Sequence, residues 1–511
     1  MPSDFDELLN HYTHRGFRVI ACATKNIQQA SWSELQQMDR LDAESDLNFV
    51  GFIIFENKLK SSTTDVITEL REANIRNIMC TGDNILTAVS VARECGILKE
   101  NSQCFVPYFA EGNPFDATAR LCWESTDGLG FQLDENTLLP LSSALESDPA
   151  NPYNRGADYS IAVSGEVFRW IVDFAPEGVL NRMLALGQVF ARMSPDEKHE
   201  LVEKLQSLDY CVGFCGDGAN DCGALKASDV GISLSEAEAS VAAPFTSRVF
   251  DISCVPKLIR EGRAALVTSF CCFKYMSLYS AIQFTSVSFL YASASNLGDF
   301  QFLFIDLALI LPIAIFMGWV GPYSTLCRKR PTANLVSRKV LTPLLGQIGL
   351  CILVQMLAFE TVQTQDWYKP PKLDRNDTSI TNSQNTALFL VSCYQYIFSG
   401  IVLSVGRPFR QPMTSNFPFV VTIVVALSFS TYMLFDPAPW LYRLMQLTYM
   451  STVFKNWLLV LAIAGFIVAY VAERRVFPGL ARGIGSAYCW LRPSKKKERR
   501  KYKVLLEKMS R

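Results

Sequence analysis

The stretch that decides the fold is Tyr210-Cys211-Val212-Gly213-Phe214-Cys215-Gly216-Asp217-Gly218-Ala219-Asn220-Asp221. Its apolar first half is typical of a β-strand, and a Gly-Asp-Gly turn follows it directly. Glycine on both sides of Asp217 lets the backbone turn sharply and approach a phosphate group and its metal ion. Asp217 is then free to bind a hard cation such as Mg²⁺ through oxygen, with Asp221 as the second carboxylate. The residues expected to shape and orient this phosphate and Mg²⁺ site are Gly216, Gly218 and Asn220.

A second strand-to-turn signal lies upstream, in Ile78-Met79-Cys80-Thr81-Gly82-Asp83. In that turn the Thr81 hydroxyl and the backbone N–H groups of Gly82 and Asp83 would lie beside the same phosphate. Groups of this kind converge at the carboxyl ends of the strands in an open parallel sheet. We therefore expect Thr81, Gly82 and Asp83 to take part in phosphoryl chemistry.

The sequence Ser194-Pro195-Asp196-Glu197 predicts the start of a helix, with a capping residue, a proline in the first position and a capping-box glutamate. Lys198 then falls in the first turn, where its ammonium group would offset the charge of a phosphoryl group. A lysine in the first turn of a helix is otherwise usually solvated, so both interpretations stay open for Lys198.

The composition changes sharply along the 511 residues. Residues 1–255 are ordinary for a globular domain, whereas residues 265–472 form long apolar runs, which raise the hydrophobic fraction to 49%. The net charge of −1 gives no reason to expect a nucleic-acid partner. The acidic, polar N-terminus does not resemble a signal peptide, so membrane insertion would depend on the later apolar runs. The 15 cysteines are expected to be reduced thiols.

Six apolar runs are long enough to span a bilayer: about 267–291, 300–320, 340–361, 385–405, 417–436 and 453–472. The loops 321–339 and 406–416 and the tail 476–511 are rich in lysine and arginine, so the positive-inside rule places them in the cytosol together with both termini. The sequon Asn376-Asp377-Thr378 falls in a loop on the opposite side. The basic tail would either contact anionic membrane lipid or be solvated.

Few ionisable residues lie within these apolar runs, and they are the candidates for binding a charged ligand within the membrane. Asp306 is a carboxylate deep in the second run, and Asp299 lies near the start of the same helix. A carboxylate beside amide and aromatic side chains suits an organic cation, whereas Ca²⁺ prefers more oxygen ligands. For Asp306 the alternative is a packing carboxylate that a neighbouring helix satisfies. The preceding helix supplies the other candidates: Tyr275, Tyr279 and Gln283.

The fold class is therefore an α/β domain with a parallel sheet, followed by an α-helical membrane bundle. Residues 1–50 precede this domain, residues 51–255 form it, residues 256–475 form the bundle and residues 476–511 form a basic tail. Residues 101–158 have no clear periodicity and are interpreted as an insertion of loops and short strands. We expect a helix at 84–95 and strands at 49–55, 75–80, 188–192, 210–215 and 230–234.

Three segments resemble, in order and spacing, the phosphorylation-domain motifs of P-type ATPases: Thr81-Gly82-Asp83-Asn84, 191–198 and Gly216-Asp217-Gly218-Ala219-Asn220-Asp221. The segments 273–279 and 296–306 resemble the type 5, subgroup B branch, the endolysosomal polyamine transporters. The resemblance covers essentially the whole chain. It implies a haloacid-dehalogenase-like phosphorylation domain after the end of a nucleotide-binding domain, the fifth to tenth membrane helices, ATP and Mg²⁺ as cofactors, and a late endosomal, lysosomal or ER membrane.

The chain departs from that family pattern in what it lacks. It contains no Asp-Lys-Thr-Gly sequence, whose aspartate such a phosphate pocket would phosphorylate. By the same pattern it also lacks the actuator domain, most of the nucleotide-binding domain and the first four helices. Phosphoryl transfer needs an acceptor in line with the donor, so we expect the chain alone to be inactive.

Three hypotheses follow. The first is that the chain is the C-terminal part of an ATP-driven polyamine or cation transporter. The second is a non-catalytic short isoform, starting at Met1, that binds or regulates a full-length relative or an accessory subunit. The third, a membrane-anchored phosphatase of the haloacid-dehalogenase type, needs the same absent nucleophile.

Overall fold

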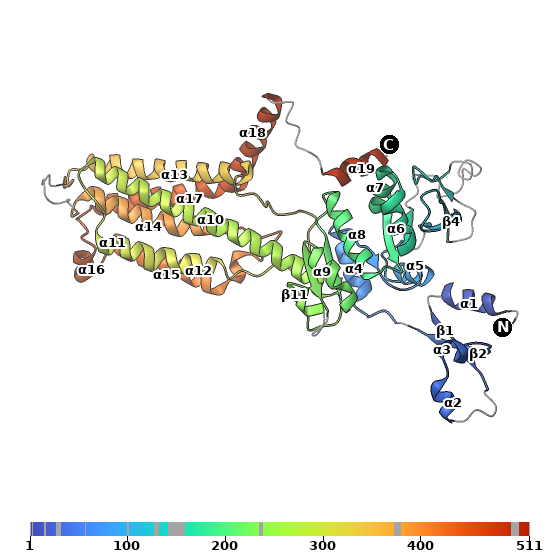
Figure 1. The fold of residues 1–511 in the computed structure, drawn as a ribbon. Helices are drawn as coiled ribbons and strands as arrows, with labels where there is room; N and C mark the ends of the chain where they lie inside the picture. The colour runs from blue at the N-terminus through green and yellow to red at the C-terminus, as the bar shows by residue number, and fades with distance from the viewer. Residues whose placement is uncertain are drawn as a thin grey trace. The chain divides into compact units, whose positions relative to one another are not determined.

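The computed structural model describes residues 2, 4–14, 17–26, 32–56, 58–99, 102–126, 132–141, 159–234, 239–371, 380–491 and 500–509. It divides into two compact units (Figure 1). The first comprises Met1–Lys257 and Glu498–Arg511, and the second comprises Leu258–Lys497. The sequon at 376–378 lies outside the described residues.

The first unit begins with a small antiparallel sheet. Strand β1 (Arg18–Thr24) pairs antiparallel with β2 (Asn48–Phe55), and helix α1 (Phe5–His14) packs on β1. The short helices α2 (Trp32–Gln37) and α3 (Arg40–Ala43) lie between the strands in sequence. The strand expected at 49–55 therefore exists, but its assignment to the parallel sheet was wrong. Its pairing partner is an upstream strand that the sequence reasoning missed.

The main sheet has six strands in the order β3-β8-β7-β4-β5-β6. Strands β3 (Met79–Cys80), β8 (Gly187–Ala191) and β7 (Ser160–Ser164) are parallel, and β4 (Cys104–Glu111) continues them in parallel beside β7. Strands β5 (Arg120–Ser125) and β6 (Gln132–Leu133) extend the sheet in antiparallel fashion. The expected insertion at 101–158 thus contributes strands to the sheet itself. Its residues 142–158 lie outside the described part of the chain.

Helices cover this sheet because each has one apolar face. They are α5 (Ile85–Glu94), α6 (Gly165–Phe174), α7 (Glu177–Leu186) and α8 (Pro195–Ser207), and α4 (Thr63–Glu72) precedes β3 in the chain. In α5 the Asn84 side chain caps the helix by accepting from the Leu86 N–H, while Ala88, Val89 and Ala92 are buried. The predicted helix at 84–95 is confirmed.

A second, three-stranded parallel sheet is separate from the first. Its order is β11-β10-β9, with β9 (Gly213–Gly216), β10 (Val230–Ser233) and β11 (Phe245–Thr246), and α9 (Cys222–Ala227) connects β9 to β10. We expected one parallel sheet, and in the described residues no strand hydrogen-bonds β3 to β9. Strand β9 also starts three residues later than expected, because Asp209 adopts a left-handed conformation with φ 64° and turns the chain before Tyr210.

The end of the chain packs on this first unit. Helix α19 (Lys501–Met509) lies beside α7 (Figure 1), and the Tyr502 ring stacks on Tyr210 with ring centroids 4.2 Å apart and planes 21° apart. The Lys501 N–H donates to Asp209 Oδ2 at 2.9 Å, and the Tyr502 N–H donates to the Leu208 carbonyl at 3.1 Å. Residues 501–509 are thus a docked helix, rather than the lipid-bound or solvated tail that the sequence suggested.

The second unit contains the predicted membrane helices. In the described residues six helices are long and apolar enough to cross a membrane, which confirms the expected number. They are α10 (Cys254–Ala292); α11 (Asp299–Leu303) continuing through η5 (Phe304–Ile310) into α12 (Leu311–Met317); α13 (Arg338–Gln363); α14 (Ser383–Leu403); α15 (Phe417–Phe435); and α17 (Thr452–Val471) continuing through η7 (Ala472–Val476) into α18 (Phe477–Leu491). The short helix α16 (Pro439–Leu444) precedes the last span.

Helix α14 is the core helix of this bundle: 89% of the residues in its apolar stretch are buried. The long helices run alongside one another (Figure 1), and α14 packs against α13, α15 and α17. Helix α18 packs on α13, where a side chain on Gly346 would overlap the Phe477 ring. Part of the expected tail at 476–511 is therefore a continuation of the last span.

We predict that Tyr502→Ala releases α19, whereas Tyr502→Phe keeps it docked because the phenyl ring preserves the stack on Tyr210. Losing this half-buried aromatic pair should raise the rate of hydrogen exchange at the residue-502 amide by about tenfold or more. Hydrogen exchange measured by mass spectrometry checks this. Equal exchange in the Ala and Phe variants would show that the ring stack does not hold the helix.

Candidate active site and membrane carboxylates

The Gly-Asp-Gly turn follows β9, as its sequence predicts. After Gly216 and Asp217 the chain enters the short helix η3 (Ala219–Asp221), which turns the Asp221 side chain back under the strand end. A Cβ at Gly216 would overlap the Asp221 carboxylate, so only glycine allows this close approach. Asp217 and Asn220 are exposed on the outer side of the turn, and Asp221 is buried.

Lys198 forms an ion pair with Asp221. Lys198 Nζ lies 2.8 Å from Asp221 Oδ1, and each side chain is 11% exposed. Lys198 is thus not the solvated first-turn lysine of the alternative interpretation. A buried ammonium group next to a carboxylate can share its charge with a phosphoryl group that enters the site.

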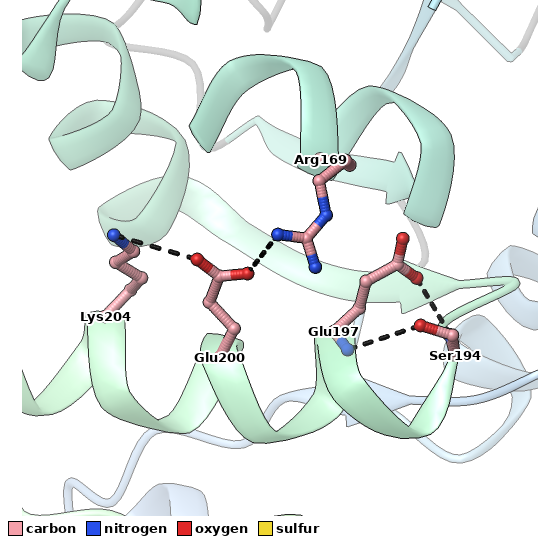
Figure 2. A network of polar contacts seen from close by, with 5 residues as sticks. All are labelled: Arg169, Ser194, Glu197, Glu200 and Lys204. Carbon is pink, nitrogen blue, oxygen red and sulfur yellow. Dashed lines mark hydrogen bonds and ion pairs between the residues drawn. The ribbon is translucent and has the colours of Figure 1, made fainter. Parts of the chain in front are cut away.

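The start of α8, the helix that carries Lys198, is fixed by local contacts (Figure 2). The Ser194 N–H donates to Glu197 Oε2 at 2.8 Å, and the Glu197 N–H donates to Ser194 Oγ at 3.3 Å, which confirms the predicted capping box. One turn later Glu200 accepts from Arg169 of α6 at 2.6 Å and pairs with Lys204. These contacts hold α8 against α6 and limit movement of its first turn.

The Thr81 turn is attached to the segment between β8 and α8. The Met193 N–H donates to the Thr81 carbonyl at 3.0 Å, and the Arg192 N–H donates to the Asp83 carbonyl at 3.0 Å. The Asp83 N–H donates to Thr81 Oγ1 at 3.1 Å, which fixes the hydroxyl at the strand end. Gly82 and Asp83 are exposed at the tip of this turn.

A partly buried thiol lies directly before each of the two turns. Burial raises the pKa of Cys80, directly before Thr81, to about 12; the Lys198 charge opposes this and the Asp221 charge adds to it. Burial likewise raises the pKa of Cys215, directly before Gly216, to about 12, and the Cys254 thiol and the carboxylates of Asp217 and Asp221 add to it. The Asp221 carboxylate therefore contributes to the raised pKa of both thiols.

The carboxylates of the Asp217 turn fit a Mg²⁺ ion whose remaining ligands would be phosphate and water oxygens. Among the described residues no group of three or more His, Cys, Asp or Glu side chains is arranged to hold a metal by itself. Mg²⁺ is commonly bound by one or two carboxylates, with water and phosphate oxygens as its other ligands. Asp217 is exposed for such a role, whereas Asp221 is already paired with Lys198 and is better placed to orient the site.

In the second unit Asp306 contacts α10. The Tyr279 hydroxyl donates to Asp306 Oδ1 at 2.6 Å, and Gln283, one turn further along α10, interacts with Tyr279. The Tyr396 ring of α14 lies edge-on against Tyr279, with centroids 5.8 Å apart at 61°. Sequence reasoning missed Tyr396. Its signal is a polar series inside an apolar span, Tyr394-Gln395-Tyr396.

The other two candidates lie elsewhere. Tyr275 is 1% exposed, belongs to the bundle core and approaches Gly400 of α14, so it does not share the Asp306 surface with Tyr279. Asp299 is exposed in the first turn of α11, about 10 Å along the helix from Asp306. The structure thus groups Tyr279, Gln283 and Asp306 and separates Tyr275 and Asp299 from them.

We predict that Lys198→Met lowers the free energy of unfolding by about 3–5 kcal/mol, because it leaves the buried Asp221 carboxylate without its cation. The double variant Lys198→Met, Asp221→Asn should recover part of this loss. Lys204→Met is the matched control, since Lys204 lies on the same helix with a more exposed side chain. Denaturant unfolding measures all of them, and equal stability of Lys198→Met and Lys204→Met would contradict the buried pair.

We predict that Cys80 and Cys215 react slowly with iodoacetamide at pH 8. With pKa values of about 12, only about 10⁻⁴ of each thiol is ionised at that pH, and the thiolate is the nucleophile. The exposed Cys211 serves as the reference. Mass spectrometry of the alkylated peptides measures the reaction in the native protein. The same measurement after denaturation shows whether these thiols react once they are exposed. Native-state alkylation of Cys80 as fast as that of Cys211 would contradict this burial.

Comparison with known proteins gives a consistent result. No family model matches the chain. It is 50% identical over 511 residues to the vacuolar cation-transporting ATPase YPK9 of Saccharomyces cerevisiae, covering 99% of this chain and 33% of the yeast protein. It is 40% identical to human polyamine-transporting ATPase 13A3 and 41% identical to human polyamine-transporting ATPase 13A2, in each case over 93% of this chain.

The chain spans only part of these relatives, namely 41% of human 13A3 and 40% of human 13A2. Their names and the extent of the match agree with the motifs at Thr81, Lys198 and Asp217 and with the six apolar helices. The resemblance seen in the sequence is confirmed: the chain belongs to the P-type ATPases of the 13A type and corresponds to one portion of them.

Proposed function

We propose that these residues work as the phosphorylation and membrane portion of an ATP-driven polyamine or cation transporter. The observation that carries this is the convergence of the Thr81 turn, the Lys198–Asp221 pair and the Asp217 turn at the strand ends of one unit. The second unit then supplies the membrane path, with six helices of spanning length. In this proposal the first unit is a haloacid-dehalogenase-like phosphorylation domain that uses ATP and Mg²⁺.

Each residue of the site has a distinct part in phosphoryl transfer. The Thr81 hydroxyl and the turn N–H groups bind the phosphoryl oxygens, and Lys198 offsets their charge. Asp217 holds Mg²⁺, which supplies charge neutralisation at the phosphoryl group, while Asp221 keeps Lys198 and the turn in place. Lys198 is already partly desolvated, so little reorganisation is needed when the phosphoryl charge develops.

The phosphoryl acceptor is not among these residues. The 511 residues contain no Asp-Lys-Thr-Gly sequence, and the chain matches only 33% of the yeast relative. We therefore place the acceptor aspartate, the nucleotide-binding surface and the actuator domain in sequence beyond these residues. The two separate parallel sheets support this, because in the described part β3 and β9 lack a strand that joins them.

In the membrane unit Asp306 is the proposed cargo carboxylate. It is exposed on a π-helical turn of an otherwise apolar span, and the Tyr279 hydroxyl and Tyr396 ring lie next to it. A carboxylate with aromatic neighbours suits a protonated amine of a polyamine. The human relatives are named polyamine-transporting and the yeast relative vacuolar cation-transporting, which supports a cationic cargo and an endomembrane location. Both termini would be cytosolic, given the basic loops.

A non-catalytic short isoform that binds a full-length relative is the second candidate. It is favoured by the self-contained core of the second unit, in which helices from all six candidate spans bury apolar side chains against one another. An antibody against residues 500–509 distinguishes the two on a denaturing gel. A product well above 57.2 kDa supports the transporter, whereas a product of that mass supports the isoform.

We predict that the isolated 511-residue chain forms no acid-stable, hydroxylamine-labile phosphoenzyme with radioactive MgATP, because the acceptor is absent. The longer polypeptide should form one, and Asp217→Asn in that polypeptide should lower the labelling rate by about 10²-fold or more. Lys204→Met is the control. Hydroxylamine-labile label on the isolated chain would refute the absence of an acceptor. Unchanged labelling of Asp217→Asn would refute the role of the turn.

A further inference from the structure

Helix α10 contacts two membrane carboxylates, and both lie on π-helical turns. Asp306 lies in η5, where it accepts from Tyr279 at 2.6 Å. Glu473 lies in η7, where Lys274 Nζ is 3.0 Å from Glu473 Oε1. A π-helical turn inserts a residue into a helix and re-aims the side chains that it carries, and such turns are frequent at functional sites. The Glu473 contact has no part in the function proposed above.

The Lys274–Glu473 pair is well buried and fully engaged. The Lys274 side chain is 13% exposed and the Glu473 side chain 8%. The second oxygen, Glu473 Oε2, accepts from Gln347 Nε2 of α13 at 3.2 Å, and the same amide donates to the Ala469 carbonyl at 3.0 Å. Charges in such a place are stable only when they are paired, so separating the two groups is costly. The pair therefore fixes one side of α10 to α13 and α17.

The two contacts lie on different sides of α10. Tyr279 follows Lys274 by five residues, which corresponds to about 140° around the helix and about 7.5 Å along it. Lys274 thus faces the last span while Tyr279 faces the second span. A rotation of α10 that moved Tyr279 away from Asp306 would also pull Lys274 away from Glu473. Because the same rotation of α10 would break both contacts, each contact opposes a rotation that would break the other.

We propose that Lys274 and Glu473 are positioning residues that set the rotation of α10 and so hold Tyr279 against Asp306. The importance of this for cargo rests on the proposed function, because it requires that Asp306 binds a cation. The pair itself does not contact cargo. Both contacts lie within the second unit, so they act on the packing of α10 in the helix bundle alone.

The test uses the full-length polypeptide that carries these residues, purified in detergent. The variants are Lys274→Ala, Glu473→Ala and the exchanged pair Lys274→Glu, Glu473→Lys. Arg475→Ala is the matched control, because Arg475 is an exposed cation on the same π-helical turn. Spermine is the probe. We expect Lys274→Ala and Glu473→Ala each to weaken spermine binding by about tenfold, the exchanged pair to restore it, and Arg475→Ala to leave it unchanged.

A purely structural role gives a different result. If Lys274→Ala lowers the unfolding temperature but leaves spermine affinity unaltered, the positioning proposal is overturned. If Lys274→Ala is not recovered folded, Lys274→Gln replaces it, since it removes the charge and keeps a donor near Glu473.

A second readout separates this proposal from the polyamine assignment. Stability without cargo is measured for Lys274→Ala, Tyr279→Phe and the double variant. The side chains do not share a partner, so additive losses would show that the two contacts are independent and would overturn the proposal. A double variant that loses clearly less than the sum supports coupling through the rotation of α10. A wild-type protein that binds no spermine would refute the polyamine assignment, and this cycle would still decide the positioning role.

Discussion

The ion pair between Lys198 and Asp221 is the contact on which the first unit depends. It joins the first turn of α8 to the turn after β9, and α8 packs against α9 alongside it. The main sheet and the three-stranded sheet share no strand pairing in the described residues, so this pair and the helix packing around it connect them. Because the pair is buried, removing either partner would leave an uncompensated charge in the protein, which makes the link costly to break. In the function proposed above, the same pair also serves phosphoryl chemistry.

The membrane unit also contains polar side chains that are buried in apolar surroundings. Helix α14 is buried all round, and some polar side chains in and next to it bond to neighbouring segments: Asn382, directly before it, donates to Ser295 at 2.7 Å, and Gln395 donates to the Cys351 carbonyl of α13 at 3.0 Å. These bonds help to fix the register of the helices, because a polar group in apolar surroundings is stabilised by a partner. Against this centre, α10 is held by two carboxylates on different sides. The membrane unit therefore combines a fixed core with one helix whose orientation is specifically controlled.

Features that depend on nearby residues were predictable from the sequence, and features that depend on distant pairing were not. The capping box joins Ser194 and Glu197 within one turn, and the six spans follow from apolar length alone. The partner of Lys198 lies 23 residues away, and β2 pairs with a strand whose own pattern was not recognised. Helical spacing places Tyr275 and Tyr279 on one face, but packing buries Tyr275 against α14 and leaves Tyr279 to reach Asp306. In each of these three cases the outcome depends on residues that are distant in the sequence and close in the folded structure.

The docking of α19 has a consequence for how the chain is made. The Lys501–Asp209 bond joins residues 292 positions apart, with the entire membrane unit between them in sequence. During synthesis the first unit emerges long before Tyr502 exists, so the Tyr210 surface must remain uncovered until the last span has been inserted. Closing so long a loop costs little more entropy than closing one of half the length, yet the contact is delayed until residues 501–509 have been translated. Completion of the first unit thereby reports that the membrane unit has been fully synthesised.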